Sequence, residues 1–184
     1  MRSSRDISRG SCGDLSSRYG SGDDFLRTFN PSMQYQYCKN LERCYMGKAP
    51  TLRELEREYG ETLPETWLEI QVQNLSEFAG VKEKLGVERI AETARQIMFT
   101  FPFLKVTELM HFMVLFKGGK YGIFYGAVDP MTIMDALRRY VATTRREQID
   151  ACEAERKRRE ADEARKKAIS WEEWQKIKEE GGAQ

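Results

Sequence analysis

The chain has 184 residues, of which 40% are hydrophobic and 32% are charged, and its formal net charge at pH 7 is +1. This length accommodates one domain with a core large enough to fold without disulfide or metal staples. Because the charges nearly cancel, no overall field draws the chain to nucleic acid or to an anionic membrane, and binding of either kind would need a local patch.

Neither a metal site nor a membrane segment is predicted. The cysteines Cys12, Cys38, Cys44 and Cys152 form no CxxC pair, and the only histidine is His111. These are too few well-spaced ligands for zinc, so we expect free, reduced thiols, which suit the cytoplasm. No stretch approaches 18 apolar residues and no apolar signal segment is visible, so we expect a soluble cytoplasmic protein that contacts no membrane.

The chain is predicted to divide into three regions. Residues 1–24 are rich in serine, arginine, glycine and aspartate and are expected to form a disordered tail, because they cannot bury enough surface to offset the entropy of ordering. Its arginines leave open a weak phosphate-contacting arm. A helical core domain is expected over residues 25–146, and a projecting charged helix with a terminal tryptophan-containing helix over residues 147–184.

Helices follow one another through the first part of the core domain. Capping boxes at Thr51–Glu54 and Thr62–Glu65 predict two helix starts, and an apolar stripe opposite a charged face predicts a third helix. Together with an earlier segment that begins at a proline, the predicted helices span residues 31–46, 52–59, 62–79 and 87–100. These elements predict an all-α fold, a small helical bundle.

The densest apolar run, LKVTELMHFMVLFKGGKYGIFYGAVD, lies at residues 104–129. A short helix over 108–117, capped by Thr107 or a neighbour, is apolar on nearly all sides and should therefore be buried by other helices. Two glycines end it, and residues 120–128 then form either a small β-hairpin or an irregular packed loop. We expect this stretch to be the structural hub of the fold.

A long C-terminal helix is predicted to begin at Asp129, with Pro130 in its first turn, and to run to about residue 168. Beyond Thr144 its apolar stripe fades, and acid-to-base pairs at i,i+4 would let it project into water. Ser170 and Glu173 form a further capping box that opens a terminal helix.

Catalytic and cofactor motifs are not recognised. The GGKYG segment at 118–122 lacks the GxxxxGK[ST] spacing of a phosphate loop, so its glycines are better explained as a helix end and a packed turn. His111 has no recognisable catalytic partner, and no GxSxG nucleophile motif occurs. We therefore expect no enzyme and no cofactor.

A basic cluster lies near the start of the long helix. Spacings of seven place Arg138 with Arg145, and Arg139 with Arg146, along one side of the helix where it leaves the core. The helix could contact phosphates through this side, with two further cations contributed across the glycine turn; an ordinary solvated helix face is the alternative. The predicted nucleic-acid-binding residues are Arg138, Arg139, Arg145, Arg146, Lys117 and Lys120.

The terminal helix has an apolar face formed by Trp171, Trp174 and Ile177. Exposed tryptophans are unfavourable in water, so this helix should either fold back onto the core or dock on a partner protein. These three residues are the predicted partner-binding site.

Residues 49–146 contain a set of motifs that carry a resemblance. They are APTLRELEREYG, a helix with Trp67, FPFL followed by TELMHFMVLFKGGKYGIFYGAVDP, and a helix that ends in a tyrosine and arginines. This region resembles a family of helical proteins from Bacteroidetes genomes, phages and mobile elements, a family for which no function is established. The resemblance implies no activity or site residue, and its genomic setting favours adaptors in DNA replication or element maintenance.

These patterns predict a non-enzymatic binding protein of a phage or mobile element that contacts nucleic acid or a DNA-replication partner through the basic helix. A protein–protein adaptor that docks through the long C-terminal helix and Trp171/Trp174 is the alternative. A small-molecule enzyme that uses His111 near Lys120 and Tyr121 is a third hypothesis. The sequence leaves the oligomeric state open.

Overall fold

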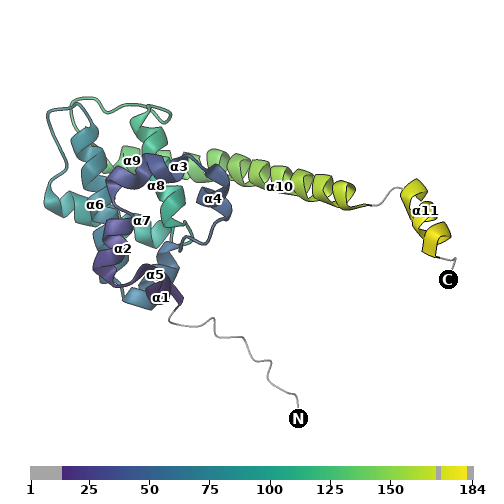
Figure 1. The fold of residues 1–184 in the computed structure, drawn as a ribbon. Coiled ribbons are helices and arrows are strands. Elements are labelled where there is room, and N and C mark those ends of the chain that lie inside the picture. The colour runs from purple at the N-terminus through teal and green to yellow at the C-terminus, as the bar shows by residue number, and fades with distance from the viewer. Residues whose placement is uncertain (1–13, 169–170, 182–184) are drawn as a thin grey trace, which may run out of the picture.

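A computed structural model describes residues 14–168 and 171–181 of the chain. These residues form helices and turns and contain no β-strand, which confirms the all-α prediction. A bundle is formed by α1 to α9, and α10 extends from it with α11 beyond its far end (Figure 1). No helix in this part of the chain is both long enough and apolar enough to cross a membrane. The elements are α1 (Asp14–Tyr19), α2 (Gly22–Thr28), the 3-10 turn η1 (Pro31–Met33), α3 (Gln34–Cys38), α4 (Leu41–Met46), α5 (Leu52–Tyr59), α6 (Thr62–Phe78), α7 (Val87–Thr100), α8 (Val106–Lys117), α9 (Pro130–Arg139), the π-helical turn η2 (Tyr140–Thr144), α10 (Arg145–Lys167) and α11 (Trp171–Gly181).

Helix α8 is the centre of the bundle (Figure 1). Side chains on all its sides are buried, among them Leu109, Met110, Phe112 and Met113, and it packs against α3, α4 and α6. A helix that is apolar all round is stable only when neighbours cover it, and here they do. The predicted hub helix is confirmed.

A second part of the core is formed by α6, which packs along α7 and against α5. Its residues Trp67, Leu68 and Val72 are fully buried. The indole Nε1 of Trp67 donates a hydrogen bond of 2.8 Å to the carbonyl of Phe29. This bond ties α6 to the end of α2, because a buried indole N–H needs an acceptor.

The capping boxes read from the sequence differ in outcome. At Thr51 the box is present as predicted, since Glu54 N donates to the threonine hydroxyl and the Glu54 carboxylate accepts from Thr51 N. At Thr62 the prediction is wrong: α6 begins with this residue, Glu61 precedes it, and no side chain caps the helix. A residue inside the first turn already has helical dihedrals and no longer occupies the capping position.

Two further helix starts were predicted incorrectly. The helix expected over 31–46 is interrupted at Asn40, whose side chain accepts from Arg43 N and starts α4. Thr107 lies inside α8 and donates its hydroxyl hydrogen to the Cys44 carbonyl at 2.6 Å. Both differences arise from polar side chains that satisfy backbone groups, one locally and one across the bundle.

The predicted region boundaries also shift. Residues 14–24 of the segment expected to be disordered lie in α1 and α2 and in the turn between them; residues 1–13 lie outside the described part of the chain. At the other end, Cys152 of α10 is buried and α10 packs against α4, where Arg159 forms an ion pair with Glu42. The helix therefore leaves the bundle well after residue 147.

Residues 120–128 form an irregular loop and not a hairpin. Their backbone forms a single bridge to the loop that precedes α7: Glu83 N donates to the Gly126 carbonyl, and Val128 N donates to the Glu83 carbonyl. Gly126 has φ +76°, a conformation that favours glycine. The loop then leads directly into the start of α9.

Asp129 caps α9 as predicted, and its replacement provides a test of that start. Its carboxylate accepts hydrogen bonds from the hydroxyl and N–H of Thr132 and from Met131 N, and these bonds hold the pKa of Asp129 below its ordinary value. We expect Asp129→Ala to lower the free energy of unfolding by about 1 kcal/mol. Asp135→Ala, an exposed change within the same helix, is the control and should alter it by less than about 0.5 kcal/mol. Urea denaturation measures both; equal effects would contradict the capping role.

Candidate functional site

The long helix contains a π-helical turn that changes which arginines share a side. In a regular α-helix, Arg145 would lie over Arg138 after two turns. The turn η2 holds one additional residue. The position over Arg138 is therefore occupied by Arg146, and Arg145 lies about 100° around the helix axis from it. The alignments predicted for Arg138 with Arg145 and for Arg139 with Arg146 are therefore both wrong.

Arg145 points into the bundle. Its Nε lies 3.2 Å from Oε1 of Glu108 on α8, with the Glu108 side chain 1% exposed and that of Arg145 25% exposed. Its guanidinium also lies over the ring of Phe103, at 5.6 Å from the centroid. Arg145 thus compensates a buried carboxylate, and the structure removes it from the predicted nucleic-acid-binding set.

Lys117 is also directed inward. Its ammonium donates hydrogen bonds to Oε1 of Gln34 and Oδ1 of Asn74, and it lies over the ring of Phe78 at 5.5 Å. Burial lowers its pKa. The amide oxygens hold this lysine between α3, α6 and α8, so it does not join the arginines.

Four of the predicted cations remain on the surface. Arg138, Arg139, Arg146 and Lys120 are exposed, and no ion pair joins the three arginines to a carboxylate among residues 14–168. The guanidinium of Arg139 lies 5.4 Å from the centroid of Tyr121, the residue next to Lys120, which places the glycine loop beside the helix. We call these four residues the basic exit patch.

His111 takes part in a buried network with two tyrosines. Its Nδ1 lies 2.6 Å from the Tyr45 hydroxyl, which lies 2.8 Å from the Tyr140 hydroxyl; Tyr140 donates to the Glu108 carbonyl at 2.9 Å. Each polar hydrogen of the network has an acceptor if the Tyr45 hydroxyl donates to the Tyr140 hydroxyl and neutral His111 donates from Nδ1 to the Tyr45 hydroxyl. Burial, with a smaller contribution from the charge of Lys120, lowers the pKa of His111 to about 4. The network links α4, α8 and η2.

The same network bears on the enzyme hypothesis. His111 is 7% exposed and its Nδ1 is engaged with Tyr45, while the Tyr121 hydroxyl donates to Thr144 at 2.9 Å. The three residues of that hypothesis are thus not brought together around a shared space: Lys120 is exposed, and the other two are buried in separate hydrogen bonds.

The two predicted tryptophans form an exposed pair on α11. Their rings stack at 5.1 Å with an interplanar angle of 19°, and Trp171 and Trp174 are 68% and 44% exposed. The side chain of Ile177 lies outside the described part of the structure. The core does not cover the two rings, and α11 lies apart from the bundle (Figure 1). In the described residues, α11 therefore does not fold back onto the core.

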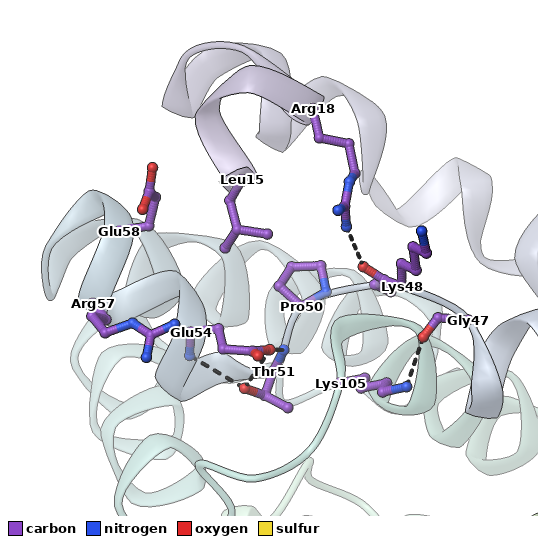
Figure 2. Close-up of a pocket in the computed structure, with 11 residues that line it drawn as sticks. Leu15, Arg18, Gly47, Lys48, Pro50, Thr51, Glu54, Arg57, Glu58 and Lys105 are labelled. Atoms are coloured by element: carbon purple, nitrogen blue, oxygen red, sulfur yellow. Dashed lines mark hydrogen bonds between the residues drawn. The ribbon is translucent and has the colours of Figure 1, made fainter. Parts of the chain in front are cut away.

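A groove near the N-terminal end of the bundle was not anticipated from the sequence. It lies between α1, the segment 47–51 and α5, and has a volume of about 550 Å³ (Figure 2). Its charged lining residues are Arg18, Lys48, Glu54, Arg57, Glu58 and Lys105. These residues come from α1, from residues 48–58 and from Lys105, which are far apart in the sequence, so no local sequence pattern indicated the groove.

A smaller hollow of about 340 Å³ adjoins this groove and shares Arg18 and Lys48 with it. Arg43 is its third cation, Tyr19, Phe29 and Tyr37 contribute rings, and no carboxylate belongs to its lining. We call this hollow the basic aromatic pocket.

Comparison with known proteins identifies a family. DUF6633, a family of unknown function, matches residues 84–181. This stretch runs from just before α7 through the basic exit patch to α11, and it excludes α1 to α6. Searches of the curated proteins and of the solved structures find no match. Because the match covers more than half of the sequence, the chain belongs to the DUF6633 family.

Proposed function

We propose that the protein is a non-enzymatic nucleic-acid-binding protein of a phage or mobile element, which contacts DNA phosphates through the basic exit patch. The observation that carries the proposal is the π-helical turn, which brings Arg138 and Arg146 onto one side of the helix and removes Arg145 from it. Exposed guanidinium groups without carboxylate partners are suited to phosphate contacts. The resemblance of residues 49–146 to proteins of Bacteroidetes genomes, phages and mobile elements supports the biological setting.

The location of the patch supports the same proposal. Arg139 lies over the ring of Tyr121, the residue that follows Lys120, so the loop and the helix bring their charges to the same region. The family match includes all four patch residues. A DNA-replication or maintenance partner bound at the same surface is the other part of this proposal.

Salt-dependent binding to DNA tests the patch. We expect fluorescence anisotropy with a labelled 20-base-pair duplex to show affinity that falls steeply between 50 and 200 mM salt, since each neutralised phosphate contributes a slope of about −0.9. Replacing Arg138, Arg139 and Arg146 together by alanine should reduce the magnitude of this slope by about 3. A single strand of the same sequence shows which form of DNA is preferred.

The matched control removes three cations elsewhere. Lys39, Arg53 and Lys82 are exposed and outside the patch, so their triple alanine variant should retain the parental slope. If both triple variants bound DNA like the parent, or if the parent failed to bind at 50 mM salt, the nucleic-acid proposal would be rejected.

A protein–protein adaptor function is favoured by one separate observation, the stacked and exposed Trp171–Trp174 pair. Since α10 packs on α4, the appropriate truncation ends at residue 168 and not at 146. Pull-downs with the full chain and with the chain ending at Ala168 compare the partner sets, and identical sets would reject docking through α11.

A further inference from the structure

The basic aromatic pocket has an aromatic wall. The rings of Phe29 and Tyr37 stack at 5.1 Å with an interplanar angle of 20°, and Tyr19 meets Phe29 edge to face at 5.3 Å. Phe29 is buried, whereas Tyr19 and Tyr37 are half-buried. The two tyrosines therefore offer ring surface to whatever enters the pocket, while the Tyr19 hydroxyl donates to the Lys48 carbonyl at 3.4 Å.

The cations of the pocket are held by the backbone around the end of α4. Gly47 N donates to the Arg43 carbonyl at 3.1 Å, and a Cβ at position 47 would lie only 2.1 Å from that oxygen, so the close approach requires glycine. Lys105 donates from Nζ to the carbonyls of Tyr45 and Gly47, at 2.8 and 2.7 Å. The segment that presents Lys48 beside Arg43 is thus fixed from both sides.

Arg18 closes the pocket from the opposite side. Its Nη1 donates to the Lys48 carbonyl at 2.9 Å, a bond visible in Figure 2, and its guanidinium lies 5.8 Å from the Tyr19 centroid. Burial raises the pKa of Tyr37, while the charge of Arg43 acts to lower it, so Arg43 lies close enough to influence that ring. Helix α1 and the segment at the end of α4 therefore bring positive charge to the aromatic wall.

This combination selects one chemical class of ligand. The exposed side chains of Arg43 and Lys48, with no carboxylate in the lining, favour an anion, and the ring surfaces favour a planar aromatic group. The volume lies within the range of about 300–1,000 Å³ typical of small-molecule sites. A peptide bound by strand addition would need a sheet edge, and residues 14–168 and 171–181 provide none.

We propose that the basic aromatic pocket binds the phosphate ester of a nucleoside, with the phosphate at Arg43 and Lys48 and the base against Tyr19 or Tyr37. The ligand has two sources that share this chemistry, a free nucleotide and the phosphorylated end of a nucleic-acid strand. The site is separate from the basic exit patch, and its cations and aromatic rings lie outside the stretch matched by the family.

Titration calorimetry on the full chain tests the pocket with AMP, adenosine, inorganic phosphate, the 5′-phosphorylated dinucleotide pdTpdT and a hexaglutamate peptide. We expect AMP or pdTpdT to bind, and adenosine and inorganic phosphate each to bind about tenfold more weakly or not at all. Tighter binding of pdTpdT identifies a strand end, and tighter binding of AMP identifies a free nucleotide.

Surface substitutions locate the binding. Arg43→Gln and Lys48→Gln should each weaken binding about tenfold, since each removes a charge-assisted hydrogen bond. Arg53→Gln and Lys39→Gln are matched controls at exposed positions outside the pocket and should bind like the parent. Thermal unfolding of all four variants verifies that they fold. The triple variant at 138, 139 and 146 should also bind AMP normally, which separates this site from the proposed DNA surface.

Four results would overturn the proposal. These are absence of binding by AMP and pdTpdT at millimolar concentration, equal binding of adenosine or of inorganic phosphate, tighter binding of hexaglutamate than of either nucleotide probe, and unchanged affinity in both glutamine variants.

Discussion

Replacing Arg145 by alanine should lower the free energy of unfolding by about 3–5 kcal/mol, the largest loss expected for any single arginine of the basic helix. The cause is the carboxylate left behind: Glu108 is 1% exposed, and Arg145 Nε at 3.2 Å is its compensating charge. The other carboxylate oxygen of Glu108 accepts a hydrogen bond from Lys105 N at 3.0 Å, and this bond does not neutralise the carboxylate charge. Urea denaturation at pH 7 measures the loss.

Arg146→Ala is the matched control, one residue further along the helix. Arg146 is exposed and outside any buried pair, so its loss should change stability by less than about 0.5 kcal/mol. The double variant Glu108→Leu/Arg145→Met should recover most of the stability, because it removes both buried charges. Similar small effects for the two alanine variants would show that the ion pair is not buried in solution.

Acidification from pH 7.5 to pH 5 should cost the protein about 2 kcal/mol of stability through His111 alone. Burial depresses its pKa in the folded state to about 4, against 6.5 in the unfolded chain. The unfolded chain therefore binds a proton as pH falls below 6.5, while the folded protein does not until about pH 4. The stabilisation is complete above pH 6.5, declines through this window, and reaches a total loss of about 3 kcal/mol below pH 4.

His111→Gln tests this dependence, since glutamine can still donate to the Tyr45 hydroxyl but does not titrate. Chemical denaturation at pH 7.5, 6 and 5 should give a flatter profile for the variant than for the parent, whatever their difference at pH 7.5. Carboxylates with lowered pKa values, such as Asp24 and Asp129, titrate mainly below this range and are present in both proteins. Parallel profiles would assign the acid sensitivity to other groups.

Much of the fold could be predicted because local rules determine it. The caps at Thr51 and Asp129 follow from hydrogen bonds within one turn, and the burial of α8 follows from its all-round apolar surface. The break at Asn40 was missed because the segment around it has helical spacing, and the competing side-chain bond depends on one residue.

The candidate sites were less predictable, because their geometry depends on contacts between distant segments. The role of Arg145 is set by Glu108, and that of Lys117 by Gln34 and Asn74, none of which is near in sequence. The basic aromatic pocket combines Arg43 and Lys48 at the end of α4 with Arg18 of α1, a segment that sequence spacing does not relate to them. Spacing rules for regular helices also cannot anticipate a π-helical turn.

That turn gives the C-terminal arm unequal tolerance of deletions along its length. Deleting the exposed Ala142 from the turn would restore a regular helix in which Arg146 is the seventh residue after Arg138. Arg145 would therefore keep its place beside Glu108, and Cys152 would keep its buried position against α4. A one-codon deletion between Arg145 and Cys152 would instead rotate everything beyond it by about 100° and draw Cys152 away from the bundle.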